Sequence, residues 1–126
     1  MYTIEVKSSF EQLWRYNTII MCGGFSPDDE LLYVVSTKDI ISDMENPIES
    51  APADFTLPRS VMLNADDAEH IRTIIYITPH TLPLGREVKE NPPFDVDVTI
   101  TKDLKNIYSS KHQVNQWGGA SIEIKL

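Results

Sequence analysis

Two stretches near the end of the chain alternate apolar and polar residues. The first covers residues 94–101 and the second residues 120–126, and their apolar positions are Phe94, Val96, Val98, Ile100, Ile122, Ile124 and Leu126. A period of two is typical of a β-strand with one buried face and one solvated face. Apolar residues of a helix recur every three or four positions instead. We therefore expect a mostly antiparallel β domain.

Further runs of β-branched and aromatic residues predict additional strands. With the two alternating stretches, the expected strands cover residues 2–8, 18–22, 30–36, 60–63, 71–78, 94–101, 107–114 and 120–126. Gly23-Gly24 is a turn signal, so we expect the run 18–22 to end there and a loop of about seven residues to follow. Residues 102–106 predict a second hairpin, with a loop of about five residues.

Short helical turns are expected at three places. Ser9 to Gln12 matches a capping box, which predicts a helical turn, although the first strand can alternatively extend through Trp14 and Tyr16. Residues 39–44 and the segment from Asn64 to His70 predict the other two turns. Repeated prolines make residues 37–60 a long loop or a crossover between sheets.

None of these helical segments is long enough to connect parallel strands. The sequence therefore predicts one all-β domain over residues 1–126, an antiparallel two-sheet β-sandwich of about seven or eight short strands. A small β-barrel is the alternative. The turn spacing resembles that of immunoglobulin-like, C2-like and jelly-roll sandwiches. This likeness is architectural and implies no function.

Charge restricts the partners of this chain. Nineteen acidic and eleven basic side chains give a net charge of −8, which repels phosphate backbones and argues against nucleic-acid binding. No apolar run approaches the ~20 residues of a transmembrane span. The residues after Met1 do not resemble a signal peptide. We expect a cytoplasmic protein if Met1 is the native start, and a secreted or cell-envelope protein if a leader was removed.

Four aromatic residues in polar stretches are the candidate binding residues: Trp117, Trp14, Tyr16 and Tyr108. Trp117 follows Asn115-Gln116 and precedes two glycines. An aromatic ring with amide neighbours suits a sugar ring or a protein hot spot. The alternative is that Trp117 closes one end of the core.

Acidic residues are the candidate metal ligands. Asp95 and Asp97 share one face of a strand, and Asp66 and Asp67 lie in a predicted loop. Ca²⁺ takes six to eight oxygen ligands, which β-sandwich loops can supply. Ca²⁺ is therefore the one cofactor that these residues suggest, and solvated loop acids are the alternative.

Cys22 is the only cysteine and lies in an apolar run. Burial raises the pKa of a thiol and makes it inert, and a cysteine hydrolase also requires a nearby histidine. The leading hypothesis is therefore a non-enzymatic module that binds a protein partner through an edge strand, such as residues 120–126, or through the loop between Ser36 and Ser60. A Ca²⁺-dependent ligand- or membrane-binding module and a small cysteine hydrolase are the alternatives.

Overall fold

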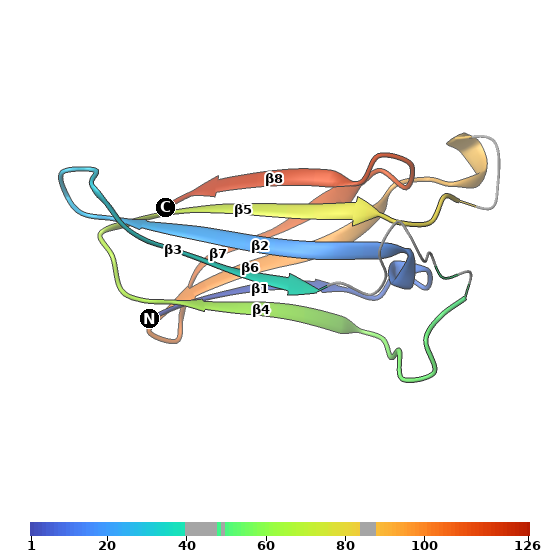
Figure 1. Ribbon diagram of the computed structural model, residues 1–126, viewed down its shortest axis with the longest axis horizontal. Coiled ribbons are helices and arrows are strands. Elements are labelled where there is room, and N and C mark those ends of the chain that lie inside the picture. The colour runs from blue at the N-terminus through green and yellow to red at the C-terminus, as the bar shows by residue number, and fades with distance from the viewer. Residues whose placement is uncertain (40–47, 49, 84–87) are drawn as a thin grey trace.

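The chain folds into two antiparallel four-stranded sheets that pack face to face (Figure 1). The computed structural model describes residues 1–39, 48, 50–83 and 88–126. Sheet A has the order β4-β1-β6-β7, formed by Arg59–Ala65, Tyr2–Ser8, Phe94–Lys102 and Lys105–Val114. Sheet B has the order β3-β2-β5-β8, formed by Leu31–Asp39, Tyr16–Phe25, His70–Pro79 and Ala120–Lys125. The expected all-β sandwich is confirmed, and the described strands do not close into a barrel.

The core lies between the sheets and follows from the alternation in each strand. Inward-facing residues of both sheets are almost completely buried, among them Ile4, Ile20, Ile75, Val98 and Ile100. The chain changes sheet after β1, β3, β4, β5 and β7, whereas β2–β3 and β6–β7 are hairpins within one sheet. Each sheet is therefore assembled from strands that are distant in sequence.

The two ends of the sandwich differ. At one end, called here the turn end, lie both termini, the β2–β3 turn (residues 26–30) and the β6–β7 turn (Figure 1). At the other, the helix end, lie the 3₁₀ helices η1 (Leu13–Arg15) and η2 (Val88–Glu90) and the β7–β8 turn. No helix in the described part of the chain has the length and apolar character needed to cross a membrane.

The first hairpin differs from its prediction. Strand β2 does not end at Cys22 but continues through Gly23 and Gly24 to Phe25. The connection to β3 is consequently residues 26–30, shorter than expected. Gly23 and Gly24 continue the strand by pairing with Val34 and Tyr33 of β3. Position 24 requires glycine, because the Tyr33 ring occupies the space where a side chain would lie, with a Tyr33 carbon 2.2 Å from the position of a Cβ.

The second hairpin is also tighter than predicted. Only Asp103 and Leu104 separate β6 from β7, and both have positive φ angles, 50° and 69°. Two consecutive positive φ values are typical of a type I′ hairpin turn. Residues 102–106 contain no glycine, which usually signals such a turn, so the local sequence does not indicate its length.

The helical predictions have mixed outcomes. A 3₁₀ turn forms at Leu13–Arg15, so β1 does not extend through Trp14. The helical turn expected from Asn64 is wrong, because Asn64 lies in β4 opposite Thr3 of β1. Of the turn expected at residues 39–44, Asp39 is the last residue of β3, and residues 40–44 lie outside the described residues.

Candidate binding surface

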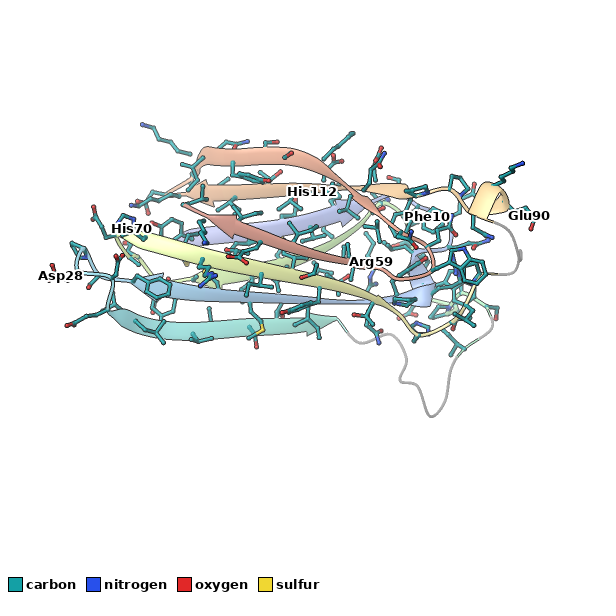
Figure 2. All side chains as sticks on the ribbon, turned by 90° about the horizontal axis from the view of Figure 1, so that it is seen from above. Phe10, Asp28, Arg59, His70, Glu90 and His112 are labelled. Carbon is teal, nitrogen blue, oxygen red and sulfur yellow. The ribbon has the colours of Figure 1, made fainter. Side chains whose placement is uncertain are left out.

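Strand β3 is an edge strand with exposed apolar side chains. It pairs with β2 on one side, and the sheet order places none of the described strands on the other. Figure 2 shows β3 in pale teal along the border of the molecule. Leu31, Leu32 and Val34 are 57%, 55% and 57% exposed. An edge strand presents unpaired backbone N–H and C=O groups, so this edge combines free hydrogen-bonding groups with apolar surface.

The other three edges carry features that discourage pairing. Strand β8 has six residues, and Glu123 and Lys125 on its outer face form ion pairs. Strand β7 carries Lys105 and Lys111 among mostly exposed polar residues. Strand β4 exposes one large apolar side chain, Met62, between two polar ones. Short length, charge and lysine are the usual protections of an edge strand. Residues 31–37 of β3 contain no charged residue.

A hollow of about 270 Å³ lies on the outer face of sheet B beside this edge. Gly23 of β2 pairs directly with Val34 of β3, and because it has no side chain it leaves the face open there. The hollow is lined by Met21, Cys22, Gly23, Phe25, Leu31, Val34, Arg72 and Ile74. The lining is therefore almost entirely apolar, with Arg72 as its charged member.

The outer face of sheet A is mostly polar, with Met62 of β4 as an isolated exposed apolar side chain. Its strands β1 and β6 present Thr3, Glu5, Lys7, Asp95, Asp97 and Thr99 outward. On sheet B, by contrast, Met21 and Tyr76 are exposed and Ile74 is half-buried. Exposed apolar side chains are therefore more numerous on sheet B, whereas Met62 and Ile107 are exposed singly on strands of sheet A.

Tyr33 anchors β3 to the rest of the molecule. Its ring covers Gly24 and its hydroxyl donates to the carbonyl of Asp66, in the link between β4 and β5. Burial is the main cause that raises the pKa of Tyr33 to about 12. The edge is therefore held in place by a contact between the two sheets at the turn end.

The β2–β3 turn holds three exposed carboxylates next to this edge. The Ser26 hydroxyl accepts hydrogen bonds from the backbone N–H groups of Asp28 and Glu30, and Ser26 N–H donates to the Glu30 carbonyl at 2.9 Å. Asp29 has a φ of 61°. These bonds fix the backbone of the turn, so the side chains of Asp28, Asp29 and Glu30 remain beside the first residue of β3 (Figure 2, Asp28).

The four aromatic residues selected from sequence lie in two places. Trp14 and Trp117 are half-buried at the helix end, whereas Tyr108 lies on β7, half-buried, with its hydroxyl 2.8 Å from His112 Nε2. The expectation that Tyr16 is an exposed binding residue is wrong. Tyr16 is 1% exposed, because it is the first inward-facing residue of β2 and its hydroxyl donates to the Gln116 carbonyl.

Arg15 is buried at the helix end without a carboxylate partner among the described residues. It is 1% exposed, and its guanidinium donates to Gln116 Oε1 at 2.7 Å, to the Thr81 carbonyl and to the Tyr16 hydroxyl. Its Nε has no hydrogen-bond partner. Gln116 in turn donates to the Pro92 carbonyl. Neutral acceptors therefore hold this buried cation, which makes it a structural centre that joins η1 to the β7–β8 turn.

The four candidate Ca²⁺ ligands do not converge. Asp95 and Asp97 lie on the outer face of β6, where Asp97 pairs with Lys111 at 3.1 Å. Asp66 and Asp67 lie at the turn end, and Asp67 pairs with the amino group of Met1. Asp97 is five residues along β6 from the strand end at Lys102, about 17 Å at ~3.4 Å per residue. Within the described residues, no three His, Cys, Asp or Glu side chains are grouped to hold a metal ion.

Cys22 faces the core rather than solvent. It is completely buried, it pairs across strands with Thr73, and burial raises the pKa of its thiol. This is the environment of a structural cysteine.

Sequence reasoning missed the β3 edge and Arg15. Residues 31–35 read as a uniformly apolar run, which is typical of a strand buried on both faces, and nothing local distinguishes such a strand from an edge. The Gly23-Gly24 pair was the available signal for the hollow, but it was interpreted as a turn.

Comparison with protein-family models, with curated proteins and with solved structures finds no match to this chain.

Proposed function

We propose that this protein is a non-enzymatic interaction module that binds an extended segment of a partner protein along strand β3. The single observation that carries the proposal is the contrast between edges. Three edges of the sandwich are shortened, charged or polar, whereas residues 31–37 of β3 are uncharged and expose three large apolar side chains. Natural β proteins usually protect such edges, so an unprotected one is a candidate site for strand addition.

Strand addition accounts for both properties of the β3 edge. Backbone hydrogen bonds from a fifth strand of sheet B would satisfy the unpaired groups of β3, and they supply affinity in this mode of recognition. Side chains of the added strand would cover Leu31 and Val34 on the outer face, and the hollow beside them gives the surface shape as well as apolarity. A flat polar edge would offer an added strand neither a shaped surface nor an apolar one.

The test is a selection of displayed random nine-residue peptides on the immobilised protein, repeated on two matched variants. Val34→Lys places a charge in the middle of the β3 edge, and Ser109→Lys places the same charge on the β7 edge, where Ser109 is exposed. We expect peptides that bind the wild type and Ser109→Lys equally and bind Val34→Lys at least about tenfold more weakly. Peptides that bind all three proteins alike would show that β3 is not the binding edge.

A further inference from the structure

The surroundings of β3 also point to the chemistry of its partner. We propose that the added segment runs antiparallel to β3, carries lysine or arginine at its C-terminal end, and inserts one bulky apolar side chain into the hollow beside Val34. This inference rests on the proposed function, because it assumes that β3 takes a strand. It adds a direction, a charge and an anchor, each of which follows from a separate observation.

The direction follows from the sheet. Every strand pair in both sheets is antiparallel, and antiparallel pairing is slightly more stable per residue than parallel pairing. Strand β3 starts at Leu31, directly after the β2–β3 turn. An antiparallel partner therefore ends beside that turn, so its C-terminal residues face Asp28, Asp29 and Glu30.

The charge follows from the carboxylates of the turn. Asp28, Asp29 and Glu30 are all exposed, and no ion pair joins them to the described cations. Arg72 and Lys125, which line a surface hollow together with Asp29, both pair with Glu123, at 2.7 and 3.5 Å. Carboxylates thus outnumber cations here, on a protein whose net charge is −8. Charge complementarity favours a basic partner end and sets the register of the added strand.

The anchor follows from the hollow. Neighbouring strands lie about 4.8 Å apart, so an outward side chain of the added strand opposite Val34 is two strand spacings from Gly23. Leu31 and Val34 of β3 also line the hollow, so a long apolar side chain such as phenylalanine or methionine that lies over Val34 reaches the near side of the hollow. Burial of such a side chain in a preformed apolar pocket is the usual origin of a hot spot.

A second copy of this chain fits the surface less well. Its own β3 edge would bring another acidic turn and another net charge of −8 to the complex, and like charges oppose association. The observations therefore favour a basic, unrelated segment over self-association.

The experiment uses the peptides selected on the wild-type protein and adds two variants. In the first, Asp28→Asn, Asp29→Asn and Glu30→Gln are combined to remove the charge of the turn, and asparagine tolerates the positive φ of Asp29. In the second, Gly23→Val fills the hollow. A Cβ at Gly23 meets Phe25 and Leu31 at 3.4 and 3.5 Å, which is ordinary van der Waals contact. Circular dichroism and urea unfolding confirm that each variant is folded.

We expect the selected peptides to be enriched in lysine and arginine in their C-terminal third and in one bulky apolar residue near the middle. Each variant should weaken their binding about tenfold, and the effect of the neutralised turn should decrease at high salt. A peptide with its basic residues moved to the N-terminal end is the matched control and should bind like the neutral one.

The outcomes separate the two proposals. Peptides that require β3 but show no basic preference, or show it at the N-terminal end, would overturn this inference and leave the proposed function standing. Peptides that bind Val34→Lys as well as the wild type would overturn both. Concentration-dependent dimerisation in sedimentation, abolished by Val34→Lys, would identify a second copy as the occupant and would also overturn the inference.

Discussion

Among the described residues, Leu104 is the non-glycine residue with the largest positive φ. It has a φ of 69° in the two-residue turn between β6 and β7, and it is 98% exposed. A left-handed conformation costs an L-residue roughly 1–2 kcal/mol, and only glycine adopts it freely. Because the side chain is solvated, no packing contact compensates for this cost.

We therefore predict that Leu104→Gly raises the free energy of unfolding by about 0.5–1 kcal/mol. The backbone strain that glycine relieves at this turn exceeds the free-energy cost of the entropy that it adds to the unfolded chain. Urea unfolding followed by circular dichroism measures the change. Leu104→Ala keeps the strained φ and is the control, which we expect to show no gain. Equal stabilisation by both substitutions would contradict the strain argument.

The buried Arg15 guanidinium depends on Gln116. Gln116→Ala removes the 2.7 Å acceptor of Arg15 and the donor to the Pro92 carbonyl. We predict a loss of about 2–3 kcal/mol in the free energy of unfolding, because the buried guanidinium loses its shortest acceptor and keeps only the Thr81 carbonyl and the Tyr16 hydroxyl. Gln113→Ala, on the exposed part of β7, should stay within about 0.5 kcal/mol of the wild type. A similar small effect for both substitutions would show that the Arg15 contact contributes little.

His80 gives the helix end a dependence on pH. Burial lowers the pKa of His80 from its usual 6.5, and the hydrogen bond from Nε2 to the Trp14 carbonyl offsets this only in part. The unfolded chain therefore binds this proton first as the pH falls. We predict that stability decreases below about pH 6.5, down to the pKa of the folded state.

The pH prediction is tested by comparing His80→Gln with His70→Gln, where His70 is exposed on β5. The His80 variant should lose less stability between pH 7 and pH 5 than the wild type, whereas the His70 variant should follow the wild-type curve. Parallel curves for all three proteins would assign the pH dependence to other groups.

At the level of the element, the β2–β3 hairpin depends on two adjacent glycines with different roles. A Cβ on Gly24 would lie 2.2 Å from the Tyr33 ring. The ring would then have to move, and its hydroxyl would lose the hydrogen bond to the Asp66 carbonyl. A Cβ on Gly23 makes only ordinary contacts.

Gly24→Ala should therefore lower the free energy of unfolding by about 1–3 kcal/mol, whereas Gly23→Ala should raise it by about 0.5–1 kcal/mol through the unfolded state. Thermal and urea unfolding of the two variants provide the comparison. If Gly24→Ala is neutral, the Tyr33 ring does not occupy the space above it. The two variants also separate stability from binding, because Gly23 lines the hollow and Gly24 does not.

At the scale of the whole molecule, the connections between the sheets determine how the protein unfolds. Strand β1 pairs with β4 and β6, and β2 pairs with β5, so neither half of the chain forms a complete sheet. Small domains of this kind usually unfold in one cooperative step. We predict that tryptophan fluorescence, which reports on Trp14 and Trp117 at the helix end, and far-UV circular dichroism give the same urea midpoint. An earlier fluorescence transition would show that the helix end opens separately.

Much of the fold was predictable from local pattern. Alternation at residues 94–101 and 120–126 identified two strands and their buried faces, and the buried residues of β6 are those that the pattern selected. Turn lengths were not predictable, because Gly23 and Gly24 pair with Val34 and Tyr33 instead of forming a turn, and Leu104 forms a tight turn without glycine. Both outcomes depend on partners or backbone angles that the local pattern does not encode.

The sequence alone determined that this chain forms an antiparallel all-β domain with a net charge of −8, since period-two alternation and net charge are properties of the chain itself. Only the tertiary structure decided which strand is left at an unprotected edge, that Tyr16 and Arg15 are buried, and that Gly23 opens a hollow beside Val34. The physical reason is that a strand's pattern specifies which face is buried, whereas its neighbours in the sheet are chosen by contacts between residues far apart in the chain.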